Sequence, residues 1–187
     1  RQDVPSILAT QRGPVSRPLL RRMRRWGDGA RFLRRIEELL DSKARSVEEL
    51  PRDYEFNSIP ATSGLHNPTT AIWNLYDQPV PQINYVHNLE HGGVAVQYGS
   101  EVPDEAVAGL ANWYQQDPRG LLVAPLAADL EEEDPTLADQ IVVTSWTHML
   151  RCASFDEEAL SNFSDDYRGP QGDAPEKFEL DQLQQGG

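Results

Sequence analysis

Three short stretches of this chain are apolar at almost every position, a pattern that predicts buried β-strands. They cover residues 94–98, 121–124 and 141–146, and Gly99 follows the first of them. Residues 148–152 either continue the third stretch or form a fourth strand after a bend. The pattern therefore predicts a sheet of three or four short strands.

Two further segments have the spacing of amphipathic helices. The first starts at Pro103 and repeats apolar residues at i, i+3, i+4 and i+7 until Asp117. The second is predicted to begin with a capping box formed by Ser154 and Glu157, and apolar residues follow at every fourth position. The apolar residues are Val107, Leu110, Ala111 and Tyr114 in the first helix and Phe155, Ala159, Phe163 and Tyr167 in the second.

The resulting order, β-α-β-β-α, predicts an α+β fold with a small antiparallel or mixed sheet and helices on one face. The acidic run 131–134 predicts a solvated hairpin or loop. Residues 57–84 are rich in proline, asparagine and threonine, yet they contain Ile72, Trp73 and Tyr76. We therefore expect an ordered loop there, of the kind that often carries function.

The first 50 residues differ from the rest of the chain in charge. They hold 12 basic and 7 acidic residues, whereas residues 51–187 hold 5 and 23. The stretch before Asp28 resembles an organellar transit peptide or a juxtamembrane arm, with a solvated helical extension as the alternative. Apolar residues on one face of residues 32–40 predict an amphipathic helix.

These observations divide the chain into three parts. Residues 1–50 form a basic, arginine-rich arm and helical extension, residues 51–170 a single α+β domain, and residues 171–187 an irregular tail. Within the first part, residues 1–40 are the segment that we expect to dock on a protein partner.

The chain as a whole has a formal net charge of −13, from 17 basic and 30 acidic residues. Nucleic acids and anionic lipids bind to positive surfaces, so we expect no nucleic-acid partner. No stretch approaches the roughly 18 apolar residues of a membrane span, so we expect no transmembrane segment in this chain. Peripheral association with a membrane is compatible with the absence of such a segment.

Cys152 is the only cysteine, which excludes an internal disulfide and any metal site built from several thiolates. A metal ion would have to be bound by histidine and carboxylate. His87 and His91 are four residues apart, so on a helical turn both imidazoles lie on one face, with Glu90 beside them. His66 lies in the loop upstream, from which the backbone can return over that turn.

Three imidazoles from His66, His87 and His91 form the open ligand set of a zinc or copper site. Glu90 is expected to lie near them as an orienting carboxylate or a base. The alternative is that the histidines are hydrogen-bonded packing residues in a polar loop. The paired glycines 92 and 93 favour the metal site, because they end the turn and allow close approach of the backbone. His148 and Met149 are the remaining candidates for a fourth soft ligand.

The segment from His87 to His91 also matches the H-x-x-E-H signature of inverzincin metalloproteases. In such enzymes two histidines bind zinc and the glutamate activates water. That chemistry needs a long helix around the motif and a distant acidic ligand, for which Glu157 or Glu158 are the candidates. The two glycines that follow the motif make a long helix unfavourable.

Three motifs together resemble the family catalogued as domain of unknown function 3105. They are residues 59–66, 75–81 and 86–94, which read IPATSGLH, LYDQPVP and VHNLEHGGV. The similarity extends over about residues 54–170. It implies an N-terminal membrane anchor with the domain outside the cytoplasm, and it marks His66, His87, Glu90 and His91 as the site.

These observations lead to three hypotheses. The first is a metal-binding domain, for zinc or copper, with a three-histidine site and no organic cofactor. The second is a non-catalytic accessory subunit of a larger, membrane-associated complex, in an extracytoplasmic or organellar compartment. The third is a metal-dependent hydrolase that uses the H-x-x-E-H segment. Because no nucleophile or substrate motif accompanies the histidines, we expect a non-enzymatic role.

Overall fold

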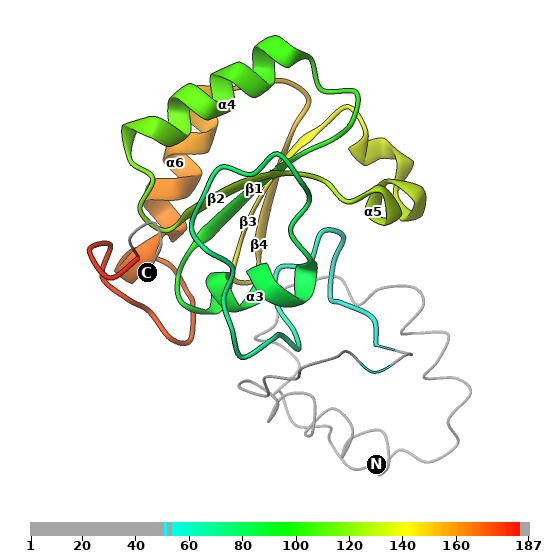
Figure 1. Ribbon diagram of the computed structural model, residues 1–187. Coiled ribbons are helices and arrows are strands. Elements are labelled where there is room, and N and C mark those ends of the chain that lie inside the picture. Colours follow the sequence, from blue (N-terminus) through cyan, green and yellow to red (C-terminus); the bar gives the residue numbers. More distant parts are fainter. Residues whose placement is uncertain (1–50, 52–53, 184–187) are drawn as a thin grey trace, which may run out of the picture. The chain divides into compact units, whose positions relative to one another are not determined.

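The computed structural model describes residue 51 and residues 54–183, and their core is a mixed four-stranded sheet (Figure 1). The strands are β1 (Val94–Tyr98), β2 (Leu121–Pro125), β3 (Ile141–Ser145) and β4 (His148–Cys152). Their order across the sheet is β2-β1-β3-β4. β1 and β2 are parallel, while β1–β3 and β3–β4 are antiparallel. The predicted α+β class and mixed sheet are therefore confirmed, and residues 148–152 form a fourth strand.

Helices α4 (Asp104–Gln116) and α6 (Glu157–Tyr167) pack on one face of this sheet (Figure 1). Side chains from alternate positions of the strands meet the apolar faces of both helices, as the period of a strand requires. The buried members of this cluster include Val94, Val96, Leu121, Val123, Ile141 and Val143 from the sheet and Leu110, Trp113, Leu160 and Phe163 from the helices. These two helices are the pair that the sequence pattern predicts.

The opposite face of the sheet is covered as well, by helix α3 (Gln82–Glu90) and by the loop before it. Ala95, Leu122 and Ala124 of the sheet contact a cluster to which α3 contributes Tyr85, Val86 and Leu89. Helices therefore lie on both faces, whereas the sequence pattern predicts them on one. The difference arises because α3 follows proline-rich residues and its apolar positions are too few for a clear helical period.

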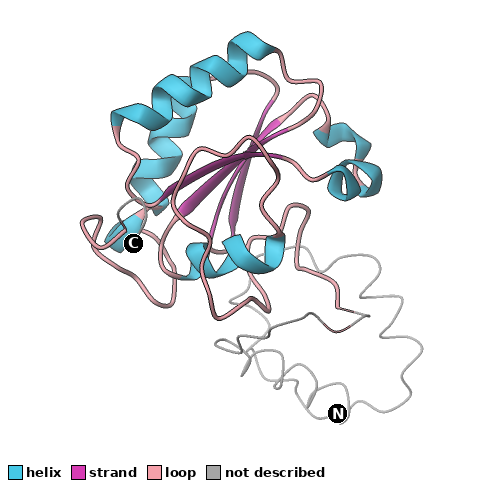
Figure 2. Ribbon diagram, in the orientation of Figure 1, coloured by secondary structure: helices cyan, strands magenta, loops and turns pink. Residues whose placement is uncertain are grey.

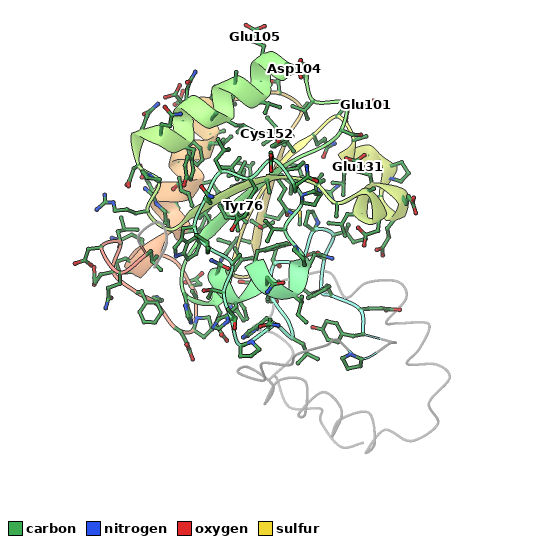
Figure 3. All side chains as sticks on the ribbon, in the orientation of Figure 1. Tyr76, Glu101, Asp104, Glu105, Glu131 and Cys152 are labelled. Atoms are coloured by element: carbon green, nitrogen blue, oxygen red, sulfur yellow. The ribbon has the colours of Figure 1, made fainter. Side chains whose placement is uncertain are left out.

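The acidic run that we expected to be a hairpin or loop lies mostly in a short helix, α5 (Ala128–Glu133). Alanine, leucine and glutamate are strong helix formers, and Asp129 and Glu131 lie in the first turn, where acidic side chains are favourable. Leu130 is buried against Leu126 and Val142, which anchors the helix. Glu131, labelled in Figure 3, accepts hydrogen bonds from the amide and hydroxyl of Ser100.

The long segment before α3 has almost no regular secondary structure, yet it is ordered by hydrogen bonds to that helix (Figure 2). The side chain of Asn88 accepts from the amide of Ala71 and donates to its carbonyl, both at 2.8 Å. Gln82 Oε1 accepts from the amide of Ala61 at 2.6 Å. These contacts fix the loop against the helix that carries the predicted site.

The predicted helix at residues 32–40 and the basic arm lie outside the described residues. Among the residues that the structure describes, no helix has the length and the apolar content that a membrane crossing requires.

Candidate metal centre

Helix α3 positions three of the four predicted site residues. His87 and Glu90 lie in its last turn, and His91 is the residue that caps it, with its amide donating to the His87 carbonyl at 3.2 Å. The four-residue spacing therefore has the predicted effect: the Nε2 atoms of His87 and His91 are 3.1 Å apart. Their rings meet edge to face at 72°, with centroids separated by 4.4 Å.

The two glycines after His91 shape the end of the helix. Gly92 has a φ of +86°, in the region that favours glycine, and its amide donates to the Leu89 carbonyl. A Cβ at Gly93 would overlap the ring of the buried Trp73. The glycines thus allow the helix to stop directly after His91 and the chain to turn into β1 beneath Trp73.

The loop returns His66 to this helix, as the sequence analysis predicts. The amide of Asn67 donates to the Ile83 carbonyl at 2.7 Å, and the amide of Leu65 donates to the hydroxyl of Tyr54 at 2.7 Å. His66 is buried, and its Nε2 lies 3.1 Å from Oε2 of Glu90, which is equally buried. The centroids of the His66 and His87 rings are 4.8 Å apart.

Backbone carbonyls orient two of the imidazoles. Nδ1 of His66 is 3.0 Å from the Gly64 carbonyl, and Nδ1 of His87 is 2.7 Å from the Asn67 carbonyl. Because a carbonyl can only accept, each Nδ1 carries a proton and each Nε2 is the atom presented to the cluster. Metal-bound histidines have the same arrangement, in which the second nitrogen donates to a carbonyl or a carboxylate.

The electrostatics differ between the three histidines. Burial by itself lowers the pKa of His66, but the hydrogen bonds to Glu90 and Gly64 outweigh it, so that the pKa is raised above its ordinary value. Burial and the positive charge on His66 lower the pKa of His87. Burial and the neighbouring His87 lower the pKa of His91. The latter two imidazoles are therefore held in the neutral form that binds metal ions.

Glu90 is a buried carboxylate whose second oxygen, Oε1, has no hydrogen-bond partner among the described residues. Buried carboxylate oxygens without a partner are costly and require an explanation, of which an ion is one. Glu90 also belongs to both groups of three residues whose ligand atoms lie within 4.8 Å of one another. The first is His66, His87 and Glu90, and the second is Glu90, His91 and Glu176. The three predicted histidines therefore do not form one such group among the described residues, because His91 belongs to the second group alone.

Glu176 was missed by the sequence analysis, which assigned it to the irregular tail. Its Oε2 lies 3.4 Å from Nε2 of His91. Among the described residues, Glu176 is therefore an acid from a distant part of the sequence that lies next to the H-x-x-E-H segment. Glu157, one of the two residues that we expected in that role, accepts a hydrogen bond from Gln116 instead. The apolar residues Phe178, Leu180 and Leu183 after Glu176 are the signal that could have identified the tail as packed.

The fourth histidine has other partners. Nε2 of His148 lies 3.0 Å from Oδ2 of Asp173, and its ring stacks on Tyr167. Met149 packs at the edge of the cluster formed by Leu126, Leu130, Leu137 and Val142. His148 does not belong to the groups of possible metal ligands among the described residues.

A family model described as "Protein of unknown function (DUF3105)" matches residues 49–182 of this chain. The match includes His66, His87, Glu90, His91 and Glu176. It also continues past residue 170, where the similarity described in the sequence analysis ends. No curated protein matches the chain. No solved structure matches it either.

Proposed function

Since this chain belongs to the DUF3105 family of proteins of unknown function, we propose that it binds one divalent metal ion, zinc or copper, through His66, His87 and His91. The ion would draw together two neighbouring groups of ligand atoms, because His66 and His91 belong to different groups. The observation that carries the proposal is the 3.1 Å separation of the His87 and His91 Nε2 atoms beside the buried pair of His66 and Glu90. Neighbouring donors of a tetrahedral ion with bonds of about 2.0–2.1 Å lie about 3.3–3.4 Å apart.

The donor set determines the class of metal. Imidazole nitrogens suit zinc and copper, and the absence of a thiolate from these groups disfavours sites of the iron–sulfur or zinc-finger type. When the metal ion binds, it takes the place of two protons. One lies in the hydrogen bond between His87 and His91, and the other lies between His66 and Glu90. Glu90 then supplies negative charge next to the ion, because three neutral imidazoles supply none.

The hydrolase hypothesis receives less support from this geometry. Helix α3 has nine residues and ends at Glu90, so the H-x-x-E-H segment does not lie within a long helix. The carboxylate of Glu90 is held against His66 and is buried. The accessory-subunit hypothesis depends on residues 1–40, which lie outside the described residues, and it stays a prediction.

Metal analysis of the full 187-residue chain tests the proposal. The purified protein, reconstituted with Zn²⁺ or Cu²⁺ and desalted, should contain one ion per chain. His87→Gln should lower the affinity by at least about 100-fold, because it removes one of three imidazole ligands. The matched control is His148→Gln, because His148 pairs with Asp173 and lies outside the proposed site. This variant should bind the metal ion with the affinity of the unmodified chain.

Two outcomes would overturn the proposal. One is the absence of a stoichiometric ion from the unmodified chain after reconstitution with either metal. The other is an equal loss of affinity in His87→Gln and His148→Gln, which would show that binding depends on exposed histidines in general.

A further inference from the structure

A second structural element reaches the metal centre from the end of the described chain. We call residues 172–183 the C-terminal strap. Main-chain hydrogen bonds hold it on the last turn of α3: the amide of Glu176 donates to the Glu90 carbonyl at 3.1 Å, and the amide of Phe178 donates to the His91 carbonyl at 3.3 Å. These are carbonyls that a helix leaves without partners at its C-terminus.

The strap is also anchored by packing. The ring of Phe178 lies edge-on to the His91 imidazole, with centroids 4.6 Å apart. Leu183 is 2% exposed, and its carbonyl accepts from the Gly120 amide at 2.6 Å. The backbone at Glu176 is therefore held by contacts that do not involve its own side chain.

The side chains of the two glutamates at the centre differ in exposure. That of Glu90 is 3% exposed, whereas that of Glu176 is 51% exposed. The first carboxylate is thus enclosed by the fold, and the second lies at the rim, where it can turn into water. A carboxylate at the rim of a metal centre occupies the direction from which an external ligand would arrive.

Charge balance gives the rim carboxylate a role. Three neutral imidazoles and the Glu90 carboxylate leave a divalent ion with one uncompensated positive charge. Leaving a charge uncompensated in a largely buried site is costly. A second carboxylate brings the net charge of the site to zero, and Glu176 is the second acid in the described groups of ligand atoms around His91.

We propose that Glu176 is a displaceable ligand of the metal ion, and that the external ligand which takes its place is a small oxygen anion of the carboxylate class. In the exchange one metal–oxygen bond breaks and another forms, and one monoanion replaces another, so that the charge of the site is unchanged. The freed Glu176 side chain turns into solvent while the strap stays docked through its backbone. This inference rests on the proposed metal site.

The experiment uses the full chain loaded with Co²⁺, whose visible absorption reports the number and type of ligands. Glu176→Ala leaves the backbone amide of the strap in place and removes the carboxylate, and Glu176→Gln retains the shape without the charge. The matched control is Glu179→Ala, three residues along the strap. Each protein is first titrated with Co²⁺ and then with acetate.

The expected result is that Glu176→Ala and Glu176→Gln bind Co²⁺ with roughly 10-fold lower affinity and an altered spectrum. Acetate should restore the spectrum of Glu176→Ala at concentrations at least about 10-fold lower than those that perturb the unmodified chain. Glu179→Ala should behave as the unmodified chain does in both titrations.

The two proposals fail in different ways. If all variants bind one Co²⁺ with identical spectra that acetate leaves unchanged, the displaceable ligand is refuted and the three-histidine site stands. If the unmodified chain binds no Co²⁺ stoichiometrically, the metal site itself is refuted.

Discussion

At the scale of single residues, the centre is defined by which nitrogen each imidazole presents. The carbonyls of Gly64 and Asn67 hold Nδ1 of His66 and His87, so that both rings present Nε2. We expected this orienting role from Glu90, but main-chain oxygens occupy it at two of the three histidines. Glu90 is thereby available for charge compensation.

The substitution Glu90→Gln isolates that charge. Glutamine keeps the size of the side chain, but it cannot balance an ion or the protonated form of His66. We expect the Zn²⁺ affinity to fall by roughly 10-fold to 100-fold. Competition with a colorimetric chelator measures the change, with Glu105→Gln in the exposed first turn of α4 as the control (Figure 3). An unchanged affinity would refute the role of this carboxylate.

At the scale of elements, the start of helix α6 shows how local hydrogen bonding selects a cap. The sequence pattern offers Ser154 and Glu157 as a capping box. In the structure the cap is Asp156, whose carboxylate accepts from the Ala159 amide at 3.0 Å. Asp156 lies three residues before that amide, the spacing that an N-cap requires, and Ser154 lies five residues before it.

This assignment yields a paired prediction. Asp156→Ala should lower the free energy of unfolding by about 0.5–2 kcal/mol, because one amide of the first turn of α6 loses its acceptor. Ser154→Ala should leave the free energy of unfolding nearly unchanged. Urea unfolding followed by tryptophan fluorescence measures both. The opposite ranking of the two variants would restore Ser154 as the cap.

The end of helix α4 is tied to the end of α6 through Asp117. Its carboxylate accepts from Arg119 Nε at 2.7 Å and from Arg168 Nη2 at 3.1 Å. The Arg119 hydrogen bond, opposed in part by burial and assisted by the Arg168 charge, lowers the pKa of Asp117. The carboxyl therefore binds its proton more weakly in the folded state than in the unfolded state.

The sign of the pH dependence follows from this shift. The Asp117 contribution to stability is complete above the unfolded-state pKa of about 3.9 and is lost as the pH falls through the folded-state pKa. Asp117→Asn should cost up to about 1 kcal/mol at neutral pH, since the pair is partly exposed. The difference from the unmodified chain should vanish in strong acid. Unfolding midpoints across this pH range test it, with the exposed Asp139→Asn as the control.

At the scale of the whole molecule, the sequence was sufficient to predict those strands and helices whose apolar residues recur with a clear period. Strands β1 to β3 and helices α4 and α6 have continuous apolar runs or a clear four-residue spacing. The same pattern could not show that α3 covers the second face of the sheet, because its packing depends on a loop without a period. His87, Glu90 and His91 were found since one helical turn joins them. Glu176 was not found, because main-chain hydrogen bonds place it next to His91 and such bonds leave no pattern in the sequence.

The first 27 residues allow a test at this scale. Their apolar residues are sparse and are interrupted by arginine, so we expect them to contribute little to the core of the domain. Deletion of residues 1–27 should leave the thermal midpoint nearly unchanged in a melt followed by circular dichroism. A large decrease of the midpoint would mean that the arm is an integral part of the domain.

The docking of the C-terminal strap through main-chain atoms has a consequence for how this site can be changed. His66, His87, Glu90 and His91 are held by contacts that also build the domain, so a substitution that changes the size of any of them disturbs packing as well as chemistry. Position 176 contributes its amide to the fold and only its side chain to the centre. It is therefore the position at which evolution or a designer can exchange a carboxylate for an imidazole or a thiolate, and so alter the metal preference, without altering the fold.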